Sequence, residues 1–273
     1  MPSFDPVTAV SRALEVLLAI NRFEVATIAQ LHQETKLHKS TVLRMLETLI
    51  HDGFVARLTD GRGYTVTGKC TLLSSGFKAA NAIARVSNPF LAQFRREQGW
   101  AVDIAIFDHD AMYISLTDHP FGTMSLNRRG ERAPMFMSSL GLSYLAFCDK
   151  SFVDALIHRL AASSDPYDSP AKDPDKLHAK LRAVRERGYA TPDPYYIKNA
   201  FQNLVGAISA PVLVAGKACA SIVVVYHVAI MDANKASELI LPGLLELTAR
   251  IGSALESEYG LQQAVEAVTV GGR

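Results

Sequence analysis

The stretch TIAQLHQETKLHKSTVLRMLETLIHDG at residues 27–53 carries the strongest structural signals of this 273-residue chain. Thr27 and Gln30 have the spacing of a capping box, which predicts the start of a helix. A polar break at 36–38 separates this helix from another, whose apolar residues recur at helical spacing until the stop signal Gly53. Two helices joined by a tight turn are typical of a helix-turn-helix.

The sequence on both sides of this stretch completes a small unit. Apolar residues between 7 and 20 recur at helical spacing and predict a preceding helix. After the second helix, the β-prone runs Phe54–Arg57 and Tyr64–Val66 flank the turn sequence DGRG at 60–63, which predicts a hairpin. The order helix, helix, turn, helix, hairpin is that of a winged helix-turn-helix.

Basic and hydroxyl side chains gather on the predicted recognition helix and hairpin. Between Lys36 and Lys69, six basic residues stand against three acidic ones, a local charge of +3 in a chain of net charge +1. Such side chains contact phosphates and base edges, so we expect this unit to bind double-stranded DNA. The candidate DNA-binding residues are Lys36, Lys39, Ser40, Thr41, Arg44, Arg57 and Arg62. The alternative is a helical dimerisation module with a solvated polar face.

The composition narrows the class of protein. Hydrophobic residues make up 49% and charged residues 20%, as in a globular protein with a substantial core. Three widely separated cysteines argue against a disulfide framework or a structural zinc site and fit a reducing cytoplasm. No signal peptide is expected, and the apolar stretch 204–231 is interrupted by glycine, proline and lysine, which predicts strands and not a membrane helix.

Motifs of enzymes are missing from the sequence. The histidines do not have zinc-ligand spacing, and no nucleophile elbow, Walker loop or dinucleotide-binding loop follows a predicted strand. Asp108-His109-Asp110 is interpreted as a turn between strands, and Cys148 as a packing residue in an apolar helix. We therefore expect no enzymatic activity, no cofactor and no metal site.

Beyond residue 67, helical and strand patterns alternate, which predicts an α+β fold overall. Residues 68–88 have the pattern of a linker helix that ends at Asn88-Pro89, although an early helix of the next domain would have the same pattern. Predicted strands are 101–107, 112–117, 123–127, 205–213 and 219–226, and predicted helices are 90–97, 138–147, 151–160, 173–187 and 244–258. We predict a DNA-binding domain over 1–67, the linker helix over 68–88, and a helix-covered sheet over 89–273.

Several motifs resemble the IclR family of bacterial transcription regulators. They are SRALEVL at 11–17, LHKSTVLRMLETL at 37–49, GFV at 53–55, YTVTG at 64–68, RGY at 187–189 and ISAPV at 208–212. The resemblance implies a C-terminal GAF-like domain that binds a small effector, and assembly into dimers or tetramers that bind a palindromic operator. Further similarity at 110–112, 130–134, 141–142 and 145–148 is to regulators of aromatic-acid breakdown, of the hydroxyphenylpropionate type.

The resemblance also implies an effector site, between a helix N-terminus and the polar edges of the last strands. The helix start falls at Ser138, Ser139, Leu140 and Gly141, where backbone N–H groups and the helix dipole suit a carboxylate. A merely capped helix would use Ser138 as well. Asp103 and Asn199 are weaker candidates for recognising hydroxyl or carboxyl groups. Arg128, Arg129 and Arg132 could draw anions towards the site or form a solvated charge cluster.

At this site the chain departs from the family pattern. Ala207 replaces a cysteine, Val223 and Val225 replace serines, and extra residues at 192–196 bring Tyr195 and Tyr196. A pocket that exchanges hydroxyls and a thiol for apolar groups should prefer an apolar or aromatic ligand. The alternative is that the valines are ordinary strand core and the tyrosines belong to a surface loop.

The sequence is compatible with two alternative functions, which belong to different classes of protein. The first is a cytoplasmic, ligand-controlled transcription regulator that responds to an aromatic or other small organic acid. The second is a small-molecule-binding or catalytic α/β domain whose N-terminal module mediates only protein contacts. Salt-dependent binding to duplex DNA would separate them, because neutralised phosphates release counterions.

Overall fold

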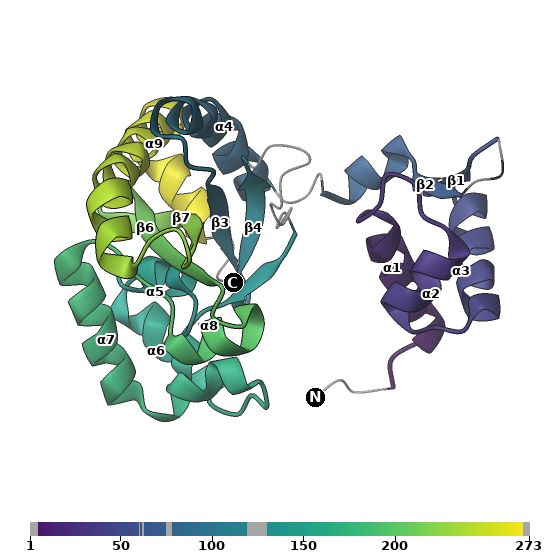
Figure 1. Ribbon diagram of the computed structural model, residues 1–273, viewed down its shortest axis with the longest axis horizontal. Coiled ribbons are helices and arrows are strands. Elements are labelled where there is room, and N and C mark those ends of the chain that lie inside the picture. Colours follow the sequence, from purple (N-terminus) through teal and green to yellow (C-terminus); the bar gives the residue numbers. More distant parts are fainter. Residues whose placement is uncertain (1–4, 60, 62, 75–77, 119–129, 270–273) are drawn as a thin grey trace. The chain divides into compact units, whose positions relative to one another are not determined.

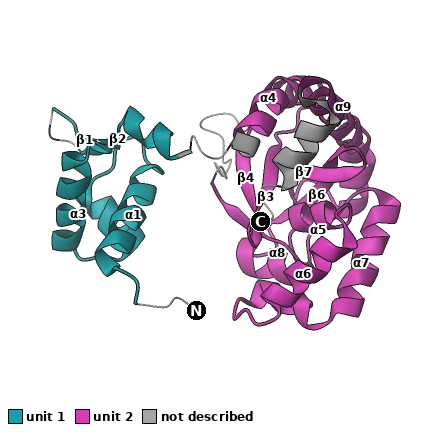
Figure 2. Ribbon diagram, turned by 180° about the vertical axis from the view of Figure 1, so that it is seen from behind, with its two compact units in different colours: residues 1–77 teal, residues 78–273 magenta. Residues whose placement is uncertain are grey.

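The computed structural model describes residues 5–59, 61, 63–74, 78–118 and 130–269 of the chain. It divides into two compact units, Met1–Phe77 and Lys78–Arg273, which Figure 2 distinguishes by colour. Each unit has its own buried core. The expectation of an N-terminal helix-turn-helix followed by an α/β domain is confirmed. None of the described helices combines the length and the apolar content needed to cross a bilayer.

The described part of the first unit contains three α-helices, a two-stranded hairpin and a 3-10 helix, in the predicted order (Figure 1). Their bounds are α1 Thr8–Ile20, α2 Ile28–Thr35, α3 Lys39–His51, β1 Val55–Arg57, β2 Tyr64–Val66 and η1 Gly68–Ser74. The two strands pair antiparallel, and Ala26 forms an isolated bridge to Tyr64. Apolar side chains from all three helices and the hairpin form one core, which orients α3 within the unit.

Local hydrogen bonds close both ends of α2. The Thr27 N–H donates to Gln30 Oε1 at 2.8 Å and the Gln30 N–H donates to Thr27 Oγ1 at 3.3 Å, so the predicted capping box is present. At the other end, Lys36 adopts a φ of 58° and turns the chain. His32 Nδ1 lies 2.7 Å from the Leu37 carbonyl oxygen and fixes this turn. The capping box and the turn hold α3 at a defined angle to α2.

The described part of the second unit is a five-stranded antiparallel sheet with helices on both faces (Figure 1). Its elements are α4 Lys78–Gln98, β3 Asp103–Asp108, β4 Ala111–Thr117, β5 Arg132–Pro134, α5 Ser139–Leu145, α6 Lys150–Leu160, η2 Pro166–Lys172, α7 Pro174–Arg187, α8 Pro194–Phe201, β6 Val205–Val214, β7 Lys217–His227 and α9 Ala233–Thr269. The strand order is β5-β4-β3-β7-β6. Helices α4 and α9 cover one face, and α5, α6 and α7 cover the other.

Side chains along β6 and β7 alternate between the two cores, as in any strand. Ile208 and Val224 belong to the core under α4 and α9. Ala207 and Val223 belong to the core under α5, and Val225 packs against it. The alternation therefore turns the residues that the sequence analysis selected on these strands toward α5.

The predicted linker helix is wrong in its bounds. The sequence predicts helices over 68–88 and 90–97, but the structure has η1 ending at Ser74 and α4 passing through Pro89 without a break. An internal proline costs a helix one hydrogen bond. The buried residues Ile83, Val86, Leu91 and Phe94 lie on both sides of Pro89 and belong to the core shared with α9. This continuous packing outweighs the lost hydrogen bond.

Other elements also differ from the sequence predictions. The extra residues at 192–196 were interpreted as part of a loop, but residues 194–201 form α8, because Asp193 caps its N-terminus and Pro194 occupies the first turn. Helix α9 begins at Ala233 and not near 244, since Ala236 and Ile240 extend its buried stripe. The edge strand β5 and the 3-10 helix η2 were not predicted. The predicted strand 123–127 lies outside the described residues.

Candidate functional sites

The first candidate site is the exposed face of α3. Val42, Leu46 and Leu49 are buried in the core of the first unit. Ser40 and Arg44 lie on the opposite side of the helix and are exposed, and Lys39 is exposed at its start. Thr41 is half-buried beside the core residues. The face of α3 that points away from its own unit is therefore polar and basic at its N-terminal end.

The basic residues of α3, of the turn before it and of β1 are not engaged elsewhere in the described part of the unit. Within the part of the chain that the structure describes, Lys36, Lys39, Arg44 and Arg57 form no ion pair or side-chain hydrogen bond, and all four are exposed. Their charges remain available to phosphates or base edges. Arg62 lies outside the described residues. Leu43, which is 40% exposed next to Arg44, and the exposed residues Glu47 and Thr48 were not selected from the sequence.

Lys69 has a different environment from the other cations of the basic segment. Its Nζ donates to the Asp52 carbonyl oxygen at 2.6 Å and lies 4.7 Å from the centre of the Phe54 ring. Thr67 Oγ1 also donates to the Gly53 carbonyl oxygen at 2.6 Å. These contacts tie the end of β2 to the end of α3. Lys69 thus positions the hairpin, which carries Arg57, against α3.

The second candidate site is a hollow in the second unit, here called the inner pocket. It lies between the start of α5, the ends of β6 and β7, and α8. Its cavity volume is about 20 Å³, within about 330 Å³ of space that includes open solvent. Among the described residues, its lining is mostly apolar and contains no charged side chain. The lining residues are Ala133, Ser138, Ser139, Leu140, Pro192, Tyr196, Ile197, Phe201, Val205, Ala207, Val223 and Val225.

The two serines of the inner pocket differ in their hydrogen bonds. Ser138 Oγ donates to the Pro134 carbonyl oxygen at 2.6 Å and accepts the Gly141 N–H at 3.0 Å, so it caps α5. Ser139 is 3% exposed, and its hydroxyl has no hydrogen-bond partner among the described residues. Among the described residues, the Ser139 hydroxyl is thus a polar group of this lining that does not cap α5.

Seven of the eleven predicted effector-site residues line the inner pocket, namely Ser138, Ser139, Leu140, Tyr196, Ala207, Val223 and Val225. Four do not. Gly141 packs against the Met135 backbone, and Asp103 is fully buried on β3, in register with Val223. Tyr195 is 47% exposed, and exposed Asn199 donates to the Tyr195 carbonyl oxygen at 2.7 Å.

Helix α8 supplies lining residues that the sequence analysis missed, above all Ile197 and Phe201. Its position depends on Asp193, which accepts the Tyr195 N–H at 3.0 Å and the Lys180 ammonium at 2.9 Å. Burial opposes ionisation of Asp193, but these two donors outweigh it and hold the pKa of the carboxyl below its ordinary value. The pair Asp193-Pro194, a capping residue followed by proline, is the sequence signal that could have revealed the helix.

Replacing Asp193 with alanine is expected to cost about 1–2 kcal/mol in the free energy of unfolding, the usual loss for a helix cap. Asp193→Asn keeps a good capping side chain and loses only the partly exposed ion pair to Lys180, so it should cost less than about 1 kcal/mol. Urea unfolding of both variants measures the difference. Equal losses would mean that the ion pair, and not the cap, holds α8.

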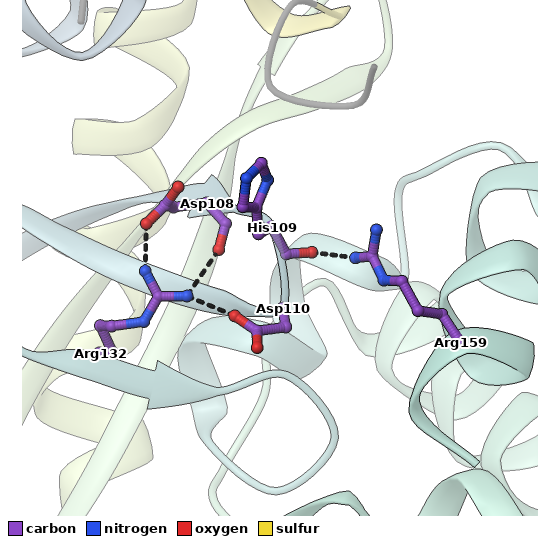
Figure 3. A network of polar contacts seen from close by, with 5 residues as sticks. All are labelled: Asp108, His109, Asp110, Arg132 and Arg159. Carbon is purple, nitrogen blue, oxygen red and sulfur yellow. Dashed lines mark hydrogen bonds and ion pairs between the residues drawn. The ribbon is translucent and has the colours of Figure 1, made fainter. Parts of the chain in front are cut away.

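The turn between β3 and β4 is held by two arginines (Figure 3). The Arg132 guanidinium pairs with the carboxylates of Asp108 and Asp110 and donates to the Asp108 carbonyl oxygen at 2.9 Å, and Arg159 donates to the His109 carbonyl oxygen. The turn interpretation of 108–110 is confirmed. Arg132 is thus committed to neighbouring carboxylates. Arg128 and Arg129 lie outside the described residues.

A wider hollow adjoins the inner pocket and is here called the outer hollow. It contains about 1210 Å³ of empty space including open solvent. Tyr196 and Phe201 line both hollows. The remaining lining residues of the outer hollow are Asp110, Ala111, Glu131, Arg132, Pro134, Asp165, Tyr167, Asp168 and Ala200.

The cysteines of the second unit have the properties of packing residues. Burial raises the pKa of Cys148 to about 12 and that of Cys219 to about 12. Both thiols are therefore protonated at neutral pH, whereas a nucleophilic cysteine needs its thiolate. Among the described residues, no group of three or more histidine, cysteine, aspartate or glutamate side chains is arranged to hold a metal ion.

Comparison with known proteins was made for the sequence and for the fold. Residues 9–59 match the family described as IclR helix-turn-helix domain, and residues 78–251 match that described as Bacterial transcriptional regulator IclR C-terminal. The Transcriptional repressor IclR of Escherichia coli K12 is 25% identical over 197 residues, 70% of this chain and 71% of the repressor. KdgR of the same bacterium, an HTH-type transcriptional regulator, is 24% identical over 186 residues, 68% of this chain and 70% of KdgR.

Solved structures with the same fold extend along most of the chain. An IclR transcriptional regulator from Alicyclobacillus acidocaldarius has a TM-score of 0.59 at 19% identity, covering 92% of this chain and 99% of its own. An IclR homolog from Microbacterium hydrocarbonoxydans, complexed with 4-hydroxybenzoate, has a TM-score of 0.63 at 18% identity. The match covers 92% of this chain and 100% of the homolog. At such identities the likeness concerns the fold.

Proposed function

Because the chain belongs to the IclR family of bacterial transcriptional regulators, we propose that it switches genes for the breakdown of an aromatic or other small organic acid. The first unit would bind an operator, and the second would bind the acid as effector. A cytoplasmic location fits this role. The observation that carries the proposal is the exposed surface of α3, where Arg44 lies opposite the buried apolar face and Lys39 lies at the start of the helix, neither with an ion-pair partner among the described residues.

For DNA recognition, we assign α3 to the major groove and the hairpin to the flanking backbone. Arg44 is suited to a base edge or a phosphate, and Ser40 and Thr41 are suited to phosphates. Lys36, Arg57 and Arg62 would contact the backbone on either side. A homodimer would place two copies of α3 in successive major grooves of a palindromic operator, about 34 Å apart. Pairing of such dimers would give a tetramer.

For the effector, we assign the inner pocket. Its apolar lining suits an aromatic or apolar ligand, and the Ser139 hydroxyl, which does not cap α5, offers one hydrogen bond. The Microbacterium homolog, complexed with the aromatic acid 4-hydroxybenzoate, supports this ligand class. To move an equilibrium between two arrangements from 1:99 to 99:1, the effector must bind one of them more tightly by about 5.5 kcal/mol.

The affinity for duplex DNA, measured at increasing salt concentration, tests the assignment of the first unit to DNA binding. When a regulator neutralises DNA phosphates, counterions are released. The logarithm of its binding constant therefore falls linearly with the logarithm of the salt concentration. Fluorescence anisotropy with a fragment from upstream of its own gene measures this slope. A slope near zero would favour the other function considered, a ligand-binding or catalytic domain with a protein-interaction module.

Replacing Ala207 with leucine is expected to weaken effector binding at least about tenfold, since the larger side chain occupies the space into which the ligand fits. Calorimetric titration with phenylpropanoate, benzoate-type acids and short aliphatic acids identifies the ligand class and provides the assay. Ala155→Leu, on an exposed position of α6, is the matched control and should bind normally. Unchanged affinity of the Ala207 variant would contradict the assignment, as would a preference for glyoxylate or pyruvate over every aromatic acid.

A further inference from the structure

Helix α1 has an apolar face that points away from the core of its own unit, here called the α1 stripe. It consists of four side chains that are more than half exposed, namely Val7, Val10, Leu14 and Leu18. Spacings of three and four residues place these side chains on one face of the helix. The residues that α1 buries in the core are Val16, Leu17, Ala19 and Ile20. A contiguous row of exposed apolar side chains marks an interaction surface.

The α1 stripe is complementary to a second copy of itself. Its end residues, Val7 and Leu18, lie at equal distances from a midpoint between positions 12 and 13, and Leu14 lies close to that midpoint. When another α1 packs antiparallel about this point, Val7 meets the partner's Leu18 at both ends of the stripe, and Leu14 meets the partner's Leu14. One two-fold axis therefore covers the whole stripe with apolar side chains.

Such a contact leaves the exposed face of α3 uncovered. Helices α1 and α3 form different sides of the first unit and share its core (Figures 1 and 2). Packed helices lie about 8–10 Å apart, so a row of α3, α1 and their two partner copies spans up to about 30 Å between the outer helix axes. The side chains on the exposed face of α3 extend beyond these axes. Their separation thus approaches the spacing of about 34 Å between successive major grooves.

The size of the α1 stripe indicates how strongly it holds two copies together. Four half-exposed valine and leucine side chains cover a few hundred Å² on each copy, whereas a standard stable interface buries about 800 Å² per partner. The contact is therefore weak by itself. It gains weight when two first units are already held close together, as on the half-sites of one operator, because the local concentration of the partner is then high.

We propose that α1 is the contact surface between the two DNA-binding units of a dimer, packed antiparallel against the partner's α1 with Val7 beside the partner's Leu18. This inference rests on the proposed function and names the surface that joins the two units. The contact makes binding to an operator with two half-sites cooperative. Other occupants of the stripe, the second unit of the same chain or an unrelated protein, are outcomes of the tests below.

A charge-pair rescue in the full chain tests the pairing of Val7 with the partner's Leu18. Fluorescence anisotropy measures the ratio between the affinities for an operator with two half-sites and for a fragment with one. Val7→Glu and Leu18→Lys should each lower this ratio at least about fivefold, because each places a charge against an apolar side chain. In the double variant the two new charges attract each other at both ends of the contact, and the ratio should recover at least about threefold.

A recovery of this kind has no source within one chain. Because α1 rises about 1.5 Å per residue, positions 7 and 18 of one copy are about 16 Å apart. Both side chains are exposed, and both substitutions suit the helix dipole at their ends of α1, so the variants should fold normally. Ala9→Glu, exposed on another face of α1, is the matched control and should leave the ratio unchanged. Additive losses in the double variant would overturn the proposed pairing.

Disulfide cross-linking of the full chain provides a readout that does not depend on DNA. Position 14 lies beside its partner copy in the proposed contact, so Leu14→Cys should form a covalent dimer under oxidation at least about tenfold faster than Arg12→Cys. Arg12 is exposed on another face of α1. The unaltered protein, with its own three cysteines, gives the background rate. Equal rates in the two variants would overturn the inference, and they are expected if the second unit or another protein covers the stripe.

These measurements separate the failure of this inference from the failure of the proposed function. Fast cross-linking of Leu14→Cys together with a salt slope near zero would keep the α1 contact and overturn DNA binding. Equal cross-linking rates together with a steep salt slope would keep the DNA-binding regulator and overturn α1 as its contact surface.

Discussion

The Arg44→Ala variant is expected to bind its operator about 10²-fold more weakly than the unaltered protein. Arg44 is exposed on α3, forms no ion pair within the described residues, and lies opposite the buried residues Val42 and Leu46. A bidentate arginine contact to a base contributes about 1–3 kcal/mol, and a dimer loses two of them. The measurement is fluorescence anisotropy of a labelled operator at several salt concentrations.

The salt dependence shows which kind of contact Arg44 makes. If it reads a base, operator affinity should fall while affinity for unrelated duplex DNA changes little, and the salt slope should stay nearly the same. If it contacts a phosphate, both affinities should fall and the slope should decrease by about 1 per protomer. Arg12→Ala removes the same charge from α1, on the other side of the core, and serves as control. Unchanged operator affinity in Arg44→Ala would show that α3 is not the recognition helix.

The DNA-binding unit could be predicted from the sequence because its signals are local. The Thr27–Gln30 capping box, the period of the apolar residues and the glycine stop at 53 all act within a few residues of the element they define. The structure contains each of them. What the sequence could not indicate is which cations are already engaged. Lys69 and Arg44 look equivalent in a charge count, yet Lys69 binds the Asp52 carbonyl oxygen and Arg44 has no side-chain partner in the part of the chain that the structure describes.

The inner pocket could be predicted only in part, because it is assembled from segments far apart in the chain. The face of β7 that carries Val223 and Val225 follows from strand alternation, once the register with β6 is known. Tyr195 and Tyr196 are neighbours in sequence, but on α8 they point in different directions, and only Tyr196 lines the pocket. Likewise, Ser138 and Ser139 both line the pocket, but Ser138 is the one that caps α5. Such differences depend on hydrogen bonds formed after folding.

The sequence predicts a role for Gly141 in ligand binding, whereas the structure gives it a role in packing. The sequence suggests that its backbone N–H faces a carboxylate. In the structure that N–H donates to Ser138 Oγ at 3.0 Å, within the cap of α5. The missing side chain is what matters, because a Cβ at this position would lie 2.6 Å from both the Cα and the carbonyl carbon of Met135. Close approach of two backbones, and not ligand contact, requires glycine here.

Gly141→Ala is therefore expected to destabilise the second unit by about 3 kcal/mol, because neither α5 nor the Met135 backbone can move away without disturbing the core around it. For a domain of this size, that loss lowers the melting temperature by about 6–12 °C in differential scanning calorimetry. Gly68→Ala is the control, since no atom lies within 4 Å of a Cβ there, and it should shift stability by less than about 0.5 kcal/mol. Because α5 also carries Ser139 and Leu140, effector affinity should fall with stability, although neither side chain is altered. If the Gly141→Ala variant has the same melting temperature as the unaltered protein, α5 can shift away from Met135. The close backbone contact would then not be what requires glycine at this position.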